Sequence, residues 1–166
     1  MRAHFDQELW GLAMHPQRTE MVTVGRDAML AAWDMPTRKQ KSCMKLEGPA
    51  DAVAFSNNGQ HICVGFINGK YIAYNYADFS IIKQASHRKG KAIQCIKYSP
   101  DDRYVAMGGH DSLIITYDVT QTYKPLKKIR GHHSTITHLD YTQDSAALMS
   151  NCTSYEILFH DLSTGK

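Results

Sequence analysis

The sequence repeats one unit four times at nearly constant spacing, and this repetition limits the fold more than any other feature. Each copy ends in a ring-bearing residue followed by Asp or Asn: Trp33-Asp34, Tyr74-Asn75, Tyr117-Asp118 and His160-Asp161. The steps between these pairs are 41, 43 and 43 residues, and a polar residue seven positions before each pair shows the same steps. A period of about 40 residues is typical of propellers and other arrays of one supersecondary unit.

Each copy also divides into the same short apolar runs, separated by turn residues. Such runs predict antiparallel strands, and Asn68-Gly69 is the clearest hairpin signal. The first strands are expected at 8–14, 50–55, 92–98 and 135–141, and the second at 21–24, 61–64, 104–107 and 146–149. The third strands are expected at 29–33, 70–74, 113–117 and 157–160, and more polar fourth strands at 39–46, 79–84 and 125–130.

Four strands per unit of about 40–45 residues predict an all-β fold, the β-propeller built from Trp-Asp (WD) repeats. The four blades are expected at about 4–46, 47–85, 86–130 and 131–166, within one propeller segment spanning 1–166. The last blade lacks its fourth strand. Propellers close with typically about 4–8 blades. We therefore expect the remaining blades of a longer parent chain, and expect the isolated segment to associate through the uncovered faces of its end blades.

Composition narrows the class of protein. With 43% hydrophobic residues, 21% charged residues and a net charge of +3, the chain is expected to be soluble and globular. The net positive charge is too small to indicate binding to nucleic acid, and the apolar runs are too short to form a membrane-spanning segment. The scattered cysteines Cys43, Cys63, Cys95 and Cys152 are interpreted as reduced thiols of an intracellular protein, mostly in the core.

The first copy carries the residues of a buried polar network: His4, Thr23, Asp27 and Trp33. A buried indole N–H needs an acceptor, and a strand hydroxyl can accept that bond and continue the chain to an imidazole and a carboxylate. His4 is therefore interpreted as structural and not catalytic. The network is expected to be degraded elsewhere, with Tyr74 and Tyr117 replacing Trp, Ala106 in place of the hydroxyl residue, and His160 ending the fourth copy.

The sequence offers no catalytic constellation. It has no Gly-rich phosphate loop, paired carboxylates or Ser-His-Asp order, so we expect no enzyme activity, no cofactor and no small-molecule substrate. His132, His133 and His138 form the densest histidine cluster, but no cysteine pair, Asp or Glu completes a zinc set in the sequence, so no metal is expected. The aromatic residues of the first strands are interpreted as packing between blades: Trp10, Phe55, Tyr98 and Tyr141.

Two surfaces are candidates for binding a partner. The loops after the second strands meet at one edge of a propeller, and they contain Arg26-Asp27, Phe66-Ile67, His110-Asp111 and Thr153-Ser154. The basic residues of the fourth strands are expected to protect exposed sheet edges from aggregation, or alternatively to form a rim that docks on an acidic surface. They are Lys39, Lys41, Lys45, Lys83, Lys127, Lys128 and Arg130.

The segment Leu-Trp-Gly-Leu-Ala-x-His-Pro at 9–16 resembles a blade of echinoderm microtubule-associated protein-like (EML) proteins. The atypical second copy, with its glycines and without Gly-His or Trp-Asp, resembles the next blade of that family, and so do the copies that follow. The resemblance covers nearly the whole chain and corresponds to part of the family's second propeller. The family's coiled coil, basic leader and inter-propeller motif are not found in this sequence.

The resemblance implies a non-enzymatic scaffold that binds tubulin, microtubules or associated proteins in the cytoplasm and cytoskeleton, with a cilium or flagellum as a further location. The alternative is a general WD-repeat adaptor without a cytoskeletal role.

Overall fold

In the computed structural model, described for residue 4 and residues 7–162, the chain forms fifteen strands and, within those residues, no helix. The strands of the first two sheets are β1 (Leu9–Met14), β2 (Glu20–Gly25), β3 (Met29–Asp34), β4 (Lys39–Lys45), β5 (Ala50–Phe55), β6 (His61–Phe66), β7 (Lys70–Asn75) and β8 (Ile81–Ser86). Those of the last two are β9 (Ile93–Tyr98), β10 (Tyr104–Gly109), β11 (Ile114–Asp118), β12 (Lys124–Ile129), β13 (Ile136–Tyr141), β14 (Ala147–Cys152) and β15 (Ile157–Asp161).

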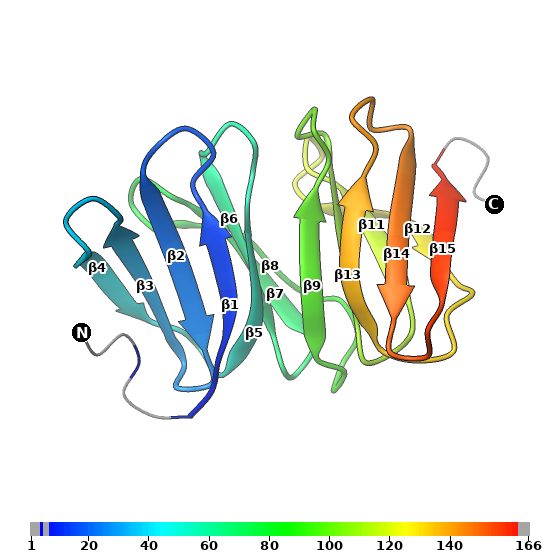
Figure 1. Ribbon diagram of the computed structural model, residues 1–166, viewed down its shortest axis with the longest axis horizontal. Coiled ribbons are helices and arrows are strands. Elements are labelled where there is room, and N and C mark those ends of the chain that lie inside the picture. Colours follow the sequence, from blue (N-terminus) through cyan, green and yellow to red (C-terminus); the bar gives the residue numbers. More distant parts are fainter. Residues whose placement is uncertain (1–3, 5–6, 163–166) are drawn as a thin grey trace.

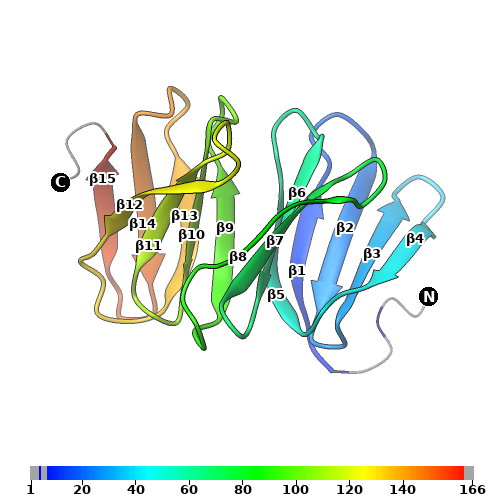
Figure 2. The ribbon, with the colours of Figure 1, turned by 180° about the vertical axis from the view of Figure 1, so that it is seen from behind.

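These strands build four antiparallel sheets, one for each sequence copy. The orders are β1-β2-β3-β4, β5-β6-β7-β8, β9-β10-β11-β12 and β13-β14-β15. Figures 1 and 2 show the sheets standing side by side in chain order, with the two termini at opposite ends of the array. We refer to them as blades one to four. The all-β propeller segment predicted from the repeat is confirmed. The predicted end of blade four, residues 163–166, lies outside the described residues.

Strand boundaries differ from the prediction mainly in the second strands, which run further than expected. They end at Gly25, Phe66, Gly109 and Cys152, because their last residues still pair with the first strand of the same sheet. The fourth strand of blade two begins at Ile81 and not at residue 79, since Phe79 has a φ of 56° and belongs to the preceding turn. The first of these differences changes the interpretation of one candidate contact residue, Phe66.

Three apolar cores lie between neighbouring blades. Blades one and two share a core that includes Val24, Val53 and Ile72, and blades two and three share one rich in tyrosine. A smaller core joins blades three and four. The outer strands β4, β8 and β12 are largely exposed, which explains why their sequences are polar. Stability therefore depends on the stacking of blades, as repeat architectures require.

Glycines on the second strands allow this stacking. A Cβ on Gly65 would lie 2.7 Å from Ile93 Cγ2, and one on Gly108 would lie 3.0 Å from Ile136 Cγ2. In both cases the contact is with the first strand of the following blade, so the missing side chain lets the two sheets approach.

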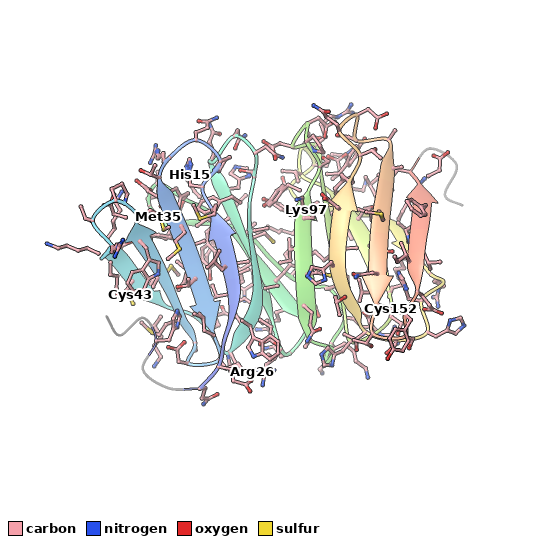
Figure 3. The ribbon with its side chains drawn as sticks, viewed as in Figure 1. His15, Arg26, Met35, Cys43, Lys97 and Cys152 are labelled. Atoms are coloured by element: carbon pink, nitrogen blue, oxygen red, sulfur yellow. The ribbon has the colours of Figure 1, made fainter. Side chains whose placement is uncertain are left out.

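The His-Pro turn of blade one also joins two blades. His15 lies with its ring centroid 5.1 Å from that of Phe55 and 5.4 Å from that of Tyr76, both in blade two. It packs over Gly59, where a Cβ would come within 2.4 Å of the imidazole. Figure 3 shows His15 at the edge of the array opposite to Arg26.

The two end blades leave apolar side chains uncovered. Leu12 and Met14 of blade one are 58% and 51% exposed, and Ile157 and Phe159 of blade four are 64% and 74% exposed. Interior blades place the equivalent faces in the cores described above. Among the described residues, no helix is long and apolar enough to cross a membrane.

Candidate partner-binding edge

One edge of the array gathers all the candidate contact loops. We call it the loop edge: it comprises the connections that follow β2, β4, β6, β8, β10, β12 and β14. Figure 3 shows Arg26, after β2, and Cys152, at the end of β14, at this same edge. Loops held on a rigid sheet scaffold are the usual place for binding residues.

Arg26 is held by hydrogen bonds to carboxylates of two blades. Its Nε donates to Asp51 Oδ1 at 3.1 Å and its Nη2 to Asp51 Oδ2 at 3.3 Å, which ties blade one to blade two. A third bond, from Nη1 to Glu8 Oε2, measures 2.5 Å. The bond to Asp51 raises the pKa of Arg26. A bidentate pair of this kind fixes the guanidinium plane.

The fixed guanidinium lies against Trp10, with its carbon 5.2 Å from the ring centroid. Trp10 Nε1 donates to Glu8 Oε2 at 2.9 Å. Trp10, expected to pack between blades, is 51% exposed in this first blade of the array, and its packing in a closed propeller stays a prediction. A register shift between Leu9 and Gly11 locally interrupts the pairing of β1 with β2. The same shift occurs in the first strands of the other blades. An exposed Trp10 thus lies beside a half-buried Arg26 at the loop edge.

A basic loop, residues 87–92, forms the second feature of this edge. Arg88, Lys89 and Lys91 are all exposed. The loop is held by backbone bonds to the β6–β7 turn: His87 N to Gly69 O at 2.8 Å and Gly90 N to Asn68 O at 2.8 Å. Gly69 has a φ of +81°, and a Cβ there would come within 1.8 Å of the Arg88 carbonyl oxygen. Close backbone contact therefore fixes the position from which the three cations project.

The structure separates the other predicted contact residues into two groups. Ile67, His110 and Thr153 are exposed on the loop edge. Phe66 is 1% exposed because it is the last residue of β6 and belongs to the core between blades one and two, and the Asp111 side chain is 1% exposed. The expectation that these two residues are accessible to a partner is wrong.

In blade one, the four network residues form one hydrogen-bonded chain. Trp33 Nε1 donates to Thr23 Oγ1 at 2.9 Å, and Thr23 Oγ1 lies 3.0 Å from His4 Nε2. His4 Nδ1 lies 2.8 Å from Asp27 Oδ2. Since the indole can only donate, the threonine hydroxyl accepts from it and donates to His4 Nε2, which leaves the Nδ1 proton for Asp27. The chain buries these polar groups with each of them paired.

In blade three, a tyrosine replaces both the indole and the missing hydroxyl. His87 Nδ1 lies 2.9 Å from the Tyr117 hydroxyl, and its Nε2 lies 4.0 Å from Asp111 Oδ2. Desolvation lowers the pKa of His87. The strand register places Met107, and not Ala106, at the position of Thr23, so the sequence alignment was off by one residue there. The longer Tyr117 side chain reaches the histidine directly.

Blade four, expected to be degraded, also has a polar chain. Ser150 and His160 lie at the positions that Thr23 and Trp33 have in blade one. Ser150 Oγ lies 2.7 Å from His132 Nε2 and 2.9 Å from His160 Nε2. Desolvation, followed by the nearby His132, lowers the pKa of His160. Sequence spacing contained this signal, because Ser150 and His160 keep the repeat offset, but imidazole was not considered as a replacement for indole.

Next to this chain the structure brings together a histidine and two side chains that are distant from it in the sequence. His132, Cys152 and Glu156 offer ligand atoms that all lie within 4.8 Å of one another. Backbone and side-chain hydrogen bonds from His133, with one from Cys152, lower the pKa of Glu156 to about 2. His138 lies exposed on β13, within the first strand expected at 135–141. The sequence predicted no Asp or Glu that could complete a metal set with the histidines, whereas the structure brings Glu156, with Cys152, next to His132.

The basic residues of the fourth strands occupy the outer edge of each four-stranded sheet. Lys41 Nζ lies 2.5 Å from Glu20 Oε1, and Lys127 Nζ bonds to the Leu162 carbonyl oxygen. Lys39, Lys45 and Lys128 are exposed. These side chains are spread along the outer strands, whereas those of the basic loop are close in sequence and lie on one fixed loop.

Comparison with known proteins agrees with the blade architecture. Residues 9–166 match the family described as the echinoderm microtubule-associated protein second β-propeller. Echinoderm microtubule-associated protein-like 2 of Mus musculus is 37% identical over 164 residues, which cover 96% of this chain and 25% of that protein. The 77 kDa echinoderm microtubule-associated protein of Strongylocentrotus purpuratus is 34% identical over 170 residues, covering 100% of this chain and 24% of that protein.

This chain thus spans about a quarter of the length of those relatives. The likeness extends over all four blades, including the second, which lacks both Gly-His and Trp-Asp. The chain therefore belongs to the echinoderm microtubule-associated protein family, as a segment of its second β-propeller.

Proposed function

We propose that the chain is part of a non-enzymatic scaffold that binds tubulin or microtubules through its loop edge, in the cytoplasm and on the cytoskeleton, including that of a cilium or flagellum. The relatives are named as microtubule-associated proteins. The observation that carries the proposal for this chain is the basic loop, where Arg88, Lys89 and Lys91 project from a backbone held against the β6–β7 turn.

The charge balance of the loop edge supports an acidic partner. The carboxylates near Arg26 are already paired, since Asp51 and Glu8 both bond to its guanidinium. Glu156 accepts bonds from His133 and Cys152, and the Asp111 side chain is buried. The basic loop keeps its three cations exposed, with Arg88 also lying 3.8 Å from the buried Asp111 carboxylate. A cationic surface of this kind attracts an acidic one such as that of tubulin, and the attraction weakens with salt.

Co-sedimentation of the full-length protein with polymerised tubulin, across a salt series, tests this proposal. The variant Arg88→Glu/Lys89→Glu/Lys91→Glu should lower affinity by at least about tenfold, because like charges facing each other across an interface cost several kcal/mol. A matched control, Lys39→Glu/Lys45→Glu/Lys128→Glu, reverses three exposed charges on outer strands and should bind as the unmodified protein does. Unchanged binding of the first variant together with weakened binding of the control would assign docking to the basic rim instead.

A second candidate function rests on a different observation. The exposed Trp10 lies over the half-buried Arg26, and tryptophan and arginine are the residue types enriched at protein interaction hot spots. A general adaptor would use this pair for a protein unrelated to the cytoskeleton. Trp10→Ala should then remove that partner from a proximity-labelling set that contains no tubulin, and a set dominated by tubulin would exclude this alternative.

A further inference from the structure

We infer that blade four holds a zinc site formed by His132 Nδ1, Cys152 Sγ and a carboxylate oxygen of Glu156. The inference is independent of the proposed function, because it follows from ligand chemistry within one blade. His132 lies in the segment that enters β13, Cys152 is the last residue of β14, and Glu156 lies in the turn that joins β14 to β15.

The separations between the ligand atoms suit one small cation. Glu156 Oε2 lies 3.4 Å from His132 Nδ1 and 3.0 Å from Cys152 Sγ. Zinc bonds of about 2.0–2.3 Å in tetrahedral geometry place ligand atoms about 3.3–3.7 Å apart. These two separations are close to the spacing that zinc requires, and all three ligand atoms lie within 4.8 Å of one another. Side-chain rotations would bring the set to tetrahedral spacing.

His132 supplies the observation that points to a missing ligand. Its side chain is only 2% exposed, and Nδ1 is buried without a hydrogen-bond partner. A buried polar atom of this kind requires an explanation. Its other ring nitrogen, Nε2, is held by Ser150 Oγ, which in turn contacts His160. When Nε2 carries the proton, the lone pair of Nδ1 faces the Glu156 carboxylate, and a cation between them would satisfy both.

The surroundings resemble those of a metal site in two further respects. The Ser154 amide lies 3.4 Å from Cys152 Sγ, in position to stabilise a thiolate. His133 donates its backbone N–H to Glu156 Oε2 at 3.0 Å, and its ring lies 2.5 Å from the other carboxylate oxygen. Outer hydrogen bonds that orient ligands in this way are characteristic of metal sites, and the Ser150 contact to His132 is another.

The ligand set favours zinc over other common cations. One imidazole, one thiolate and one carboxylate combine nitrogen, sulfur and oxygen donors, a set that Zn²⁺ accepts and that Ca²⁺ and Mg²⁺ do not. Water completes the four-coordinate site. Binding would add a further link between the β14–β15 turn and the segment that enters blade four. These already meet through the backbone bond from Thr153 N to Thr135 O and the contact between the Ser134 and Thr153 hydroxyls.

Titration of the tag-free full-length protein with zinc chloride, in competition with a chromophoric chelator, tests the inference. We expect about one high-affinity Zn²⁺ assigned to this site. Cobalt substitution should add a thiolate-to-metal charge-transfer band. Cys152→Ser should abolish that band, and Glu156→Gln should weaken zinc binding by about 100-fold or more, since losing even an outer partner costs about 10–100-fold. His138→Ala removes an exposed histidine of the same blade and serves as the matched control.

The same variants give a second measurement that does not depend on spectroscopy. Zinc should raise the melting temperature of the unmodified protein and of His138→Ala, but not that of Glu156→Gln, because only a site present in the folded state stabilises it. Glu156 is partly exposed, so this variant is expected to fold even if Cys152→Ser does not. Absence of the cobalt band, or unchanged zinc affinity in Glu156→Gln, would overturn the inference.

Discussion

Replacing Thr23 by valine should destabilise blade one through the polar network, with almost no change in side-chain shape. The hydroxyl is the shared partner of two buried groups, Trp33 Nε1 at 2.9 Å and His4 Nε2 at 3.0 Å. Thr23 and Trp33 are each 2% exposed and the His4 side chain is 5% exposed, so water cannot replace the lost partner without structural change.

The expected magnitude follows from these contacts. A buried polar group left without a partner costs about 1–3 kcal/mol, so two such groups cost about 2–6 kcal/mol. The additional methyl of valine offsets about 1 kcal/mol. Thr23→Val should therefore lower the free energy of unfolding by about 1–5 kcal/mol. Thr23→Ser keeps the hydroxyl and loses one methyl, at a cost of about 1 kcal/mol.

Urea denaturation followed by tryptophan fluorescence measures both variants, and the difference between them isolates the hydroxyl. Combining Thr23→Val with Trp33→Phe should cost less than the two single changes together, because each removes the same indole bond. If Thr23→Val leaves the free energy of unfolding unchanged from that of the unmodified protein, the network does not support the blade and the reasoning above is refuted.

Three further outcomes follow from the structure. Burial lowers the pKa of His15, His61 and His160 below 6.5. As the pH falls through 6.5, the unfolded chain therefore binds more protons than the folded chain, and the folded state loses stability. The urea midpoint should be lower at about pH 5.5 than at about pH 7.5, and an equal midpoint would contradict this. Gly65→Val should lower the free energy of unfolding by about 1–3 kcal/mol, because the new side chain overpacks against Ile93. A change at Gly48, which has no neighbouring atoms in the way, should lower it less, and chemical denaturation measures both. The isolated 166-residue chain should associate through its uncovered end faces in analytical ultracentrifugation, and a monodisperse monomer would show that these faces need no cover.

The fold was largely predictable because its evidence is distributed over the whole sequence. The constant offset between copies places each strand, and residues at equivalent positions, such as Gly65 and Gly108, prove to make equivalent contacts with the next blade. Strand ends were less predictable, because pairing with a neighbouring strand extends β6 to Phe66 and so buries a residue expected in a loop. Local sequence carries little information about such pairing.

The candidate sites were less predictable, because they depend on contacts between residues that are distant in sequence. Trp10 matched the family pattern, but its 51% exposure and its contact with Arg26 are properties of the folded array that its residue type does not indicate. His132 and Glu156 are 24 positions apart, and only the return of β14 brings them together. The basic loop could have been noticed as three cations between two strands, but its fixed position depends on the backbone bonds to Gly69.

Hydrogen–deuterium exchange of the full-length protein, with and without tubulin, tests the central claim most directly. Because we place docking on the loop edge, we expect slower exchange on binding in residues 87–92 and around Arg26, with outer strands β4 and β12 unchanged. Protection confined to those outer strands, or no protection anywhere in this propeller while tubulin is bound, would contradict the account.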